Sequence, residues 1–403
     1  MTITTDVFSE AAWRIGSQLT RTAFNDGKRC NWVGNWMEPV DGEYKTVSRS
    51  FGPDLYSGTS GIALFLAALY AETGDALLLN TLESTVNQVI STMHQVPDFG
   101  FYSGKAGISA ALVRIGELSG RKDWQQEGIA LAEGLKVRTL TAGETDLISG
   151  AAGTIPLLTQ LARDHHSEQC LETAVGLGRE LIRSAMHSGE SCSWITLPGN
   201  PPLTGFSHGA AGISYALLAL YEATGDRSFL ETALAGIRFE QELYNGQEQN
   251  WPDLRTIVKK GGSYSCAWCH GAPGIGLSRM KMKQYLPDGA QQEQAALQTT
   301  ARQLRTFLSS PQSPHNFSLC HGLAGNADIL LESGDPVFVK LASEIGSFGM
   351  ERYHHQRQSW PSGLSTTAET PGLLMGLAGT GYFYLRLANA EKFGSVLLPG
   401  LLR

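Results

Sequence analysis

The feature that most constrains the fold of this chain is a glycine-x-x-glycine element that recurs seven times in 403 residues. The spacing between the first glycines runs from 46 residues (104 − 58) to 62 residues (271 − 209), enough for one supersecondary unit. One such element is weak evidence, but seven in near-register indicate a repeat architecture. The first glycines are Gly58, Gly104, Gly150, Gly209, Gly271, Gly322 and Gly376.

Each element is followed by an apolar segment of roughly a dozen residues, which suits a buried helix. Three of these segments end in a glycine suited to a helix C-cap, namely Gly74, Gly120 and Gly225. An amphipathic helix is then predicted, for example over 226–244, where Asp226 is placed to cap the N-terminus. Each unit therefore pairs one apolar helix with one amphipathic helix.

These pairs predict an all-α fold, an (α/α)7 toroid in which seven inner helices are covered by seven outer ones. The segment 9–24 supplies the first outer helix. We expect one domain over residues 1–403. The glycine-, proline- and serine-rich stretches are interpreted as loops between units, and they cover 25–57, 187–207, 245–265 and 355–372.

Composition and charge argue against several classes of function. A net charge of −7 and a pI near 5.8 do not favour nucleic acid or an anionic membrane surface as partner. The N-terminus lacks the pattern of a secretory signal, and the apolar run 62–71 is too short to cross a bilayer. We therefore expect a cytoplasmic protein without stable membrane insertion, whose six cysteines are free, catalytic or metal-binding.

The residues just before the first glycine of each element should lie at equivalent places near one end of the toroid axis. In repeats four to six they are histidines, and cysteines precede two of these. Because these repeats are neighbours in the ring, the pattern predicts a functional site. The seven residues are Ser57, Ser103, Ser149, His208, His270, His321 and Met375, and those before them are Tyr56, Tyr102, Ile148, Ser207, Cys269, Cys320 and Leu374.

Cys269, Cys320 and His321 form a donor set suited to Zn²⁺ with a fourth position open for water or substrate. An alternative is a closed structural site in which Cys266 or His270 is the fourth ligand. The C-x-x-C-H spacing of 266–270 is also typical of covalent haem attachment. The repeat accounts for Cys269 and His270, however, and haem attachment is generally linked to export.

Three motifs resemble those of the lanthionine cyclases (LanC-like proteins): SHGAAG at 207–212, WCHGAPG at 268–274 and CHGLAG at 320–325. They occur in this order within repeats that cover essentially the whole chain. The resemblance implies an (α/α) toroid with zinc at its centre, in agreement with the periodicity. It also implies that the zinc ligands are Cys269, Cys320 and His321.

The resemblance implies an enzyme that adds peptide cysteine thiolates to dehydroalanine or dehydrobutyrine, forming thioether rings in a ribosomal peptide. His208 is then the proton-transfer residue, since a histidine can take the thiol proton and return one to the enolate. Asp146 matches an active-site aspartate that orients His208 or assists protonation. His270 is a second acid, a group that holds Cys269, or an ordinary hydrogen-bonded histidine.

The segments 268–279 and 370–389 look more like the cyclase half of bifunctional class II synthetases than like stand-alone cyclases. The expected substrate is a dehydrated precursor peptide, leader plus core. The chain is then a stand-alone cyclase working with a separate dehydratase, or a cyclase portion alone. The arginine found upstream in some stand-alone cyclases has no counterpart in 261–268.

Three alternative functions remain open from the sequence. One is a thiol- or peptide-binding module with structural zinc, and another is an enzyme that adds glutathione to dehydrated residues. The third is an (α/α) toroid glycosidase, which needs two carboxylates facing the cavity. We expect only Asp146 near the axial end of a repeat, so the glycosidase is the least favoured.

Overall fold

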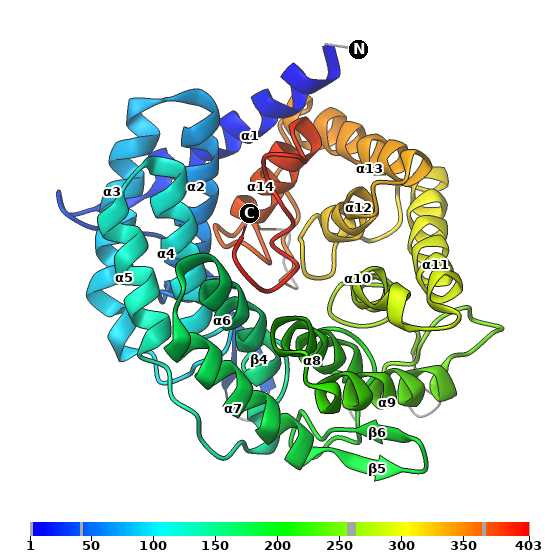
Figure 1. Cartoon of the computed structure of the whole chain (residues 1–403). Helices are drawn as coiled ribbons and strands as arrows, with labels where there is room; N and C mark the ends of the chain where they lie inside the picture. The colour runs from blue at the N-terminus through cyan, green and yellow to red at the C-terminus, as the bar shows by residue number, and fades with distance from the viewer. Residues whose placement is uncertain (1–2, 41–42, 256–262, 365–367, 403) are drawn as a thin grey trace.

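The computed structural model describes residues 3–40, 43–255, 263–364 and 368–402. Fourteen α-helices of this part form two concentric rings (Figure 1), which confirms the predicted (α/α)7 toroid. Helix α14 packs against α2, and this contact closes the inner ring. The inner helices are α2 (Thr59–Thr73), α4 (Lys105–Ser119), α6 (Ala151–His165), α8 (Ala210–Thr224), α10 (Ala272–Met282), α12 (Leu323–Glu332) and α14 (Leu377–Ala388). The outer helices are α1 (Ile3–Thr22), α3 (Ala76–Thr92), α5 (Lys122–Glu133), α7 (Glu168–Ser184), α9 (Arg227–Leu243), α11 (Gly289–Ser309) and α13 (Pro336–Gly349).

The second glycine of each repeated element is required by close packing. At all seven, a Cβ atom would lie within 2.3 Å of the carbonyl oxygen six residues earlier, from 1.6 Å at Gly107 to 2.3 Å at Gly61. The first glycine of each element caps the inner helix. The repeated motif therefore folds the turn before each inner helix tightly back onto that helix.

Three outer helices begin with an aspartate cap, the predicted Asp226 among them, and three inner helices end at the predicted glycines Gly74, Gly120 and Gly225. The Asp226 carboxylate accepts a hydrogen bond from Ser228 N (3.0 Å), and Asp75 and Asp335 cap α3 and α13 in the same way. Gly74 and Gly225 end α2 and α8 in the left-handed region, with φ of 66° and 71°. These caps fix where each helix of a pair starts and stops.

The turns before the inner helices are joined into a ring by hydrogen bonds between successive repeats. Five of the seven junctions have a backbone bond. These are Leu374 N to Tyr56 O (2.8 Å), Tyr56 N to Tyr102 O (2.9 Å), Tyr102 N to Ile148 O (2.9 Å), Leu147 N to Ser207 O (3.1 Å) and Cys320 N to Leu374 O (2.9 Å).

The fifth turn, which carries Cys266 to His270, is different. Among the described residues no backbone–backbone hydrogen bond joins it to the fourth or sixth turn. Side chains bind it instead: Ser207 Oγ donates to the carbonyl of Cys269 (2.8 Å), and Asn326 Nδ2 donates to that of Cys266 (2.8 Å).

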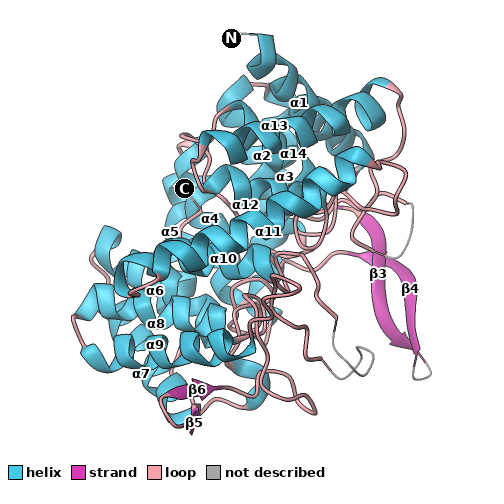
Figure 2. Cartoon of the chain, turned by 90° about the vertical axis from the view of Figure 1, so that its right-hand side faces the viewer, coloured by secondary structure: helices cyan, strands magenta, loops and turns pink. Residues whose placement is uncertain are grey.

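Two segments interpreted as loops contain short antiparallel strands. In 25–57, β1 (Phe24–Asn25) pairs with β2 (Cys30–Asn31), and β3 (Val33–Val40) pairs with β4 (Glu43–Ser50). In 187–207, β5 (Met186–Ser188) pairs with β6 (Ser191–Ser193). Glycine, asparagine and proline near these strands are typical of loops, so the alternation of β-branched and aromatic residues does not stand out as a strand pattern. The β3–β4 hairpin projects from the side of the ring where the long loops gather (Figure 2).

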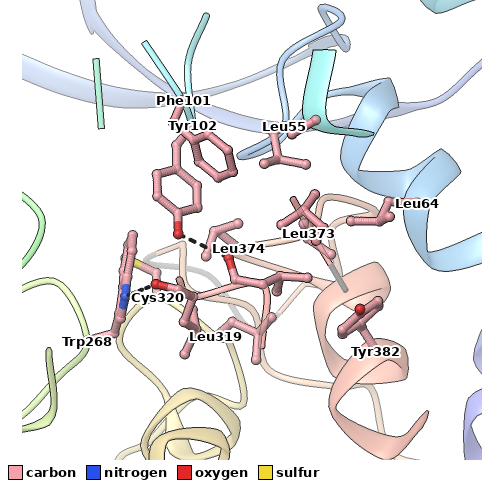
Figure 3. Close-up of a cluster of buried hydrophobic side chains, with 14 of the residues drawn as sticks. Leu55, Leu64, Phe101, Tyr102, Trp268, Leu319, Cys320, Leu373, Leu374 and Tyr382 are labelled. Atoms are coloured by element: carbon pink, nitrogen blue, oxygen red, sulfur yellow. Dashed lines mark hydrogen bonds between the residues drawn. The ribbon is translucent and has the colours of Figure 1, made fainter. Parts of the chain in front are cut away.

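The segment after α14 fills the bore of the ring, and the C-terminal end lies near its middle (Figure 1). Leu397 is buried, and its carbonyl accepts a hydrogen bond from Trp268 Nε1 (3.0 Å). The carbonyl of Val396 accepts one from Tyr102 Oη (3.0 Å), and Figure 3 shows both rings pointing toward this segment. None of the described helices is both long and apolar enough to cross a membrane.

Candidate metal centre and catalytic cavity

The turns before the inner helices surround a cavity of about 500 Å³. Its walls combine residues from repeats one to seven with Arg49 from the end of β4 and Leu364 from the segment before α14. Cys269, Cys320 and His208 all line it. The repeat thus brings one predicted site residue from each of the fourth, fifth and sixth turns to one enclosure.

Three potential metal-binding side chains cluster together, and two of them, Cys269 and Cys320, line this cavity. One ligand atom each from Cys269, Cys320 and His321 lies within 4.8 Å of the other two. Two sulfurs bound to one tetrahedral zinc would be roughly 3.8 Å apart, given a Zn–S distance of about 2.3 Å. Cys320 is buried, Cys269 is half-buried and His321 is exposed. The donor set and its spacing therefore fit zinc, and one side of the cluster is accessible.

The ring of His321 is held by the backbone of a distant segment. Its Nε2 lies 2.7 Å from the carbonyl oxygen of Gly363, which can only accept a hydrogen bond. Nε2 must therefore carry the proton, and Nδ1 keeps the lone pair that a metal needs. A Cβ at Gly363 would lie 3.1 Å from His321 Cε1 and 2.9 Å from Met375 Sδ. Glycine is thus needed for this close approach.

The two thiols of the cluster have strongly different acidities. A hydrogen bond from Cys320, followed by one from His321, holds the pKa of Cys269 well below its ordinary value. The same interaction with Cys269, together with burial, raises the pKa of Cys320 well above its ordinary value. Cys269 is therefore the thiol that ionises first in this arrangement.

His208, on the wall of the cavity, forms a hydrogen-bonded pair with Asp146. His208 Nδ1 lies 2.5 Å from Asp146 Oδ2, and Asp146 Oδ1 accepts a hydrogen bond from Ser149 N (2.8 Å). Asp146 is buried, whereas His208 is partly exposed to the cavity. The carboxylate accepts the Nδ1 proton, so the other ring nitrogen, Nε2, is free to accept one.

His270 lies behind this pair rather than on the cavity wall. Its ring stacks on that of His208 at a centroid distance of 5.9 Å, and it belongs neither to the metal cluster nor to the cavity lining. Burial lowers the pKa of His270 to about 4. Cys266 is also outside the cluster, and burial raises the pKa of its thiol to about 12. Neither predicted fourth ligand is therefore among the clustered donors.

Two residues missed by the sequence reasoning lie close to the cysteines. The hydroxyl of Tyr56 is 2.9 Å from Cys320 Sγ. Arg255 forms a bidentate ion pair with buried Asp253 (Nη2–Oδ2 2.6 Å), and its charge acts on Cys269 and Cys320. Arg255 thus brings to the site an arginine that the segment just before Cys269 lacks. Tyr56 occupies the same position in its repeat as the two cysteines do in theirs. This shared position is the sequence feature that could have identified it as a site residue.

A second carboxylate, that of Asp54, lines the cavity, which corrects the expectation that Asp146 alone lies near the axial end of a repeat. Asp54 Oδ1 accepts a hydrogen bond from Ser57 N (2.8 Å), as Asp146 does from Ser149 N. The sequence already contains the signal, because PDLYSG at 53–58 and TDLISG at 145–150 share the motif. Unlike Asp146, Asp54 is not followed by a histidine in the next repeat, where Ser103 stands.

A family model described as lanthionine synthetase C-like protein matches residues 49–398. The chain belongs to this family. Two relatives of this LanC-like chain come from Lactococcus lactis subsp. lactis. The lacticin 481/lactococcin biosynthesis protein LcnDR2 is 24% identical over 394 residues, which are 91% of this chain and 39% of that protein. The nisin biosynthesis protein NisC is 21% identical over 309 residues, 68% of this chain and 72% of that protein.

The LanC-like chain thus spans about two fifths of the length of LcnDR2. Among solved structures, a nisin cyclase superposes with a TM-score of 0.65 at 20% identity, covering 85% of this chain and 91% of that one. This similarity shows a shared toroidal fold.

Proposed function

We propose that this LanC-like chain is a zinc-dependent cyclase that forms lanthionine and methyllanthionine rings in a ribosomal peptide. Membership of the family supports the reaction class. The observation that carries the proposal is that two of the three clustered donors, Cys269 and Cys320, line the same cavity as His208, which Asp146 holds from behind. A site of this kind can activate a thiol and move a proton within the same enclosure.

Cys269, Cys320 and His321 would hold the zinc, because two thiolates and an imidazole with a free Nδ1 match its preferences. Zinc bound there supplies a Lewis acid that lowers the pKa of a peptide thiol toward neutrality. Cys266 and His270 lie outside the donor cluster, which favours an open fourth position over a closed structural site.

His208 takes the proton of the peptide thiol at Nε2, while Asp146 keeps the Nδ1 proton in place. The sulfur bonds to the β-carbon of the dehydro residue, and the electron pair of the double bond moves toward the carbonyl as an enolate. His208 then returns its proton to the α-carbon, so no proton is gained or lost overall. The positive charge of Arg255 acts on the sulfurs of Cys269 and Cys320.

The substrate is then a dehydrated precursor peptide, leader plus core. Dehydroalanine and dehydrobutyrine must be made before the ring closes, so a dehydratase has to supply this peptide. It is either a separate protein or another part of the same polypeptide, as the partial coverage of LcnDR2 allows.

Zinc X-ray absorption on the purified protein, with and without a cysteine-containing peptide, tests the proposal directly. We expect two sulfur ligands in the free protein and three with the peptide, as one oxygen ligand leaves. A shell of four protein ligands that does not change when the peptide is added would mean that the zinc is structural. The protein would then be a thiol- or peptide-binding module.

A second experiment tests the reaction itself. The protein is incubated with a dehydrated peptide, with and without glutathione, and the products are analysed by mass spectrometry after thiol alkylation. Ring closure protects the peptide cysteines from alkylation. Transfer of glutathione to the peptide without ring closure would contradict the cyclase and identify a glutathione-adding enzyme.

A further inference from the structure

The hydroxyl of Tyr56 contacts the two sulfur atoms of neighbouring repeats six and seven. It donates a hydrogen bond to Cys320 Sγ at 2.9 Å, and Met375 Sδ lies farther away at 3.4 Å. A phenol has a single proton to donate, so the shorter contact places it on Cys320. Tyr56 lines the catalytic cavity together with Cys269 and Cys320.

The position of this hydroxyl is fixed by the turn that carries it. Tyr56 N donates to the carbonyl of Tyr102 (2.9 Å), and the carbonyl of Tyr56 accepts from Leu374 N (2.8 Å). The next residue, Ser57, donates its backbone N–H to Asp54 Oδ1 (2.8 Å). Three hydrogen bonds thus hold the backbone of Tyr56 and its successor, and the side chain reaches across to the sixth turn.

Tyr102 occupies the same position in the second repeat but points elsewhere. Its hydroxyl donates to the carbonyl of Val396 in the bore, on the C-terminal segment (Figure 3). The two tyrosines therefore make hydrogen bonds of similar length to different acceptors, one to a backbone oxygen and one to the sulfur of a proposed metal ligand. The contact of Tyr56 is specific to the metal centre.

We propose that Tyr56 is a positioning residue for the metal centre, which donates a hydrogen bond to the Cys320 thiolate and limits its charge donation to the metal. The inference rests on the proposed zinc site. A hydrogen bond to a coordinating sulfur withdraws electron density from it, which keeps the metal a stronger Lewis acid. It also keeps Cys320 in the orientation needed for binding.

Cobalt(II) is the probe for this interaction, because it replaces zinc and its thiolate charge-transfer absorption reports the electron density on the sulfurs. Unsubstituted protein, Tyr56→Phe and the matched control Tyr102→Phe are titrated with Co²⁺. In Tyr56→Phe we expect the thiolate band at longer wavelength and cobalt affinity lowered by about tenfold. Tyr102→Phe should keep both the band and the affinity of the unsubstituted protein.

Thermal unfolding of the metal-free variants separates this effect from a loss of structure, because both variants lose one buried or half-buried hydroxyl contact. An unchanged band and affinity in Tyr56→Phe would overturn the proposal. So would an identical shift in Tyr102→Phe, since the shift would then reflect loosened packing. If the unsubstituted protein gives no thiolate band with Co²⁺, the proposed metal site is wrong, and the proposed function is wrong with it.

Discussion

The imidazole Nδ1 of His208 lies 2.5 Å from Oδ2 of Asp146, a residue of which only 2% is exposed. The two residues belong to neighbouring repeats: Asp146 lies four residues before the first glycine of its element, and His208 lies one residue before that of the next. A buried carboxylate that accepts the Nδ1 proton selects one tautomer of the imidazole. The fold, and not the substrate, therefore determines which ring nitrogen of His208 can accept a proton.

Asp146→Asn should slow ring closure by about 10²-fold or more, since the amide can donate to Nδ1 and so favour the wrong tautomer of His208. Zinc content should not change, because Asp146 lies outside the donor cluster. The rate is measured by mass spectrometry on a dehydrated peptide. Asp54→Asn, which alters the equivalent carboxylate without a histidine partner, should have a clearly smaller effect. Equal losses in the two variants would contradict the tautomer argument.

Gly363→Ala should weaken zinc binding by about tenfold, because the added Cβ would press on His321 Cε1 (3.1 Å) and Met375 Sδ (2.9 Å). The ring of His321 would have to shift relative to the Gly363 carbonyl that sets its tautomer. Zinc affinity is measured by competition with a chromophoric chelator. Gly143→Ala is the matched control, since a Cβ there meets no atom within 4 Å. Unchanged affinity in Gly363→Ala would mean that the Gly363 carbonyl does not orient the ligand.

Glu240→Ala should lower the free energy of unfolding by about 3–5 kcal/mol, the usual cost of leaving one partner of a buried ion pair alone. Glu240 and Arg279 are both fully buried and pair at 2.8 Å. Glu240 Oε1 also accepts hydrogen bonds from Gly205 N and Ala211 N, on either side of His208. Denaturant unfolding measures the loss. On the same helix, exposed Glu231→Ala should cost less than about 0.5 kcal/mol.

Alkaline pH should destabilise the protein through its buried thiols, and Cys192 is the clearest case. Burial raises the pKa of Cys192 to about 12. Between pH 9 and 12 the unfolded thiol has lost its proton while the native one keeps it, so the unfolded state binds fewer protons. The free energy of unfolding then falls by up to about 1.4 kcal/mol per pH unit, and below pH 9 this contribution is constant.

The measurement is denaturant unfolding at pH 8 and pH 10, with Cys192→Ala as the comparison. Removing the thiol should make the decline between the two pH values shallower, whatever the variant costs in stability at pH 8. An equally steep decline in the variant would assign the alkaline loss to other groups.

The ring architecture could be predicted from the sequence because its cause is local. Each second glycine packs against a carbonyl only six residues earlier, as at Gly107 and Phe101, so every repeat carries its own signature. The same register predicts which turns meet. It predicts that Cys269, Cys320 and His321 lie together, and the structure places their ligand atoms within 4.8 Å of one another.

The remaining site residues depend on tertiary contacts that the repeat does not encode. Tyr56 and Tyr102 share one register position, yet one hydroxyl reaches a cysteine and the other the C-terminal segment. The charge of Arg255 acts on the cysteines from the predicted loop 245–265, where an ion pair with Asp253 holds its side chain. Packing determines the direction of a side chain and the path of a loop between units. The periodicity of the repeat carries no information about either.

The fifth turn has a mechanical consequence for the chemistry of the site. The first four turns, and the sixth and seventh, are tied to a neighbour through the backbone, whereas Ser207 and Asn326 bind the fifth through their side chains. This turn carries Cys269, and a small shift of it would not break a backbone hydrogen bond to a neighbouring turn. The least backbone restraint in the ring thus falls on the turn of one proposed ligand. A metal there can exchange a fourth ligand of one size for another without straining the whole toroid.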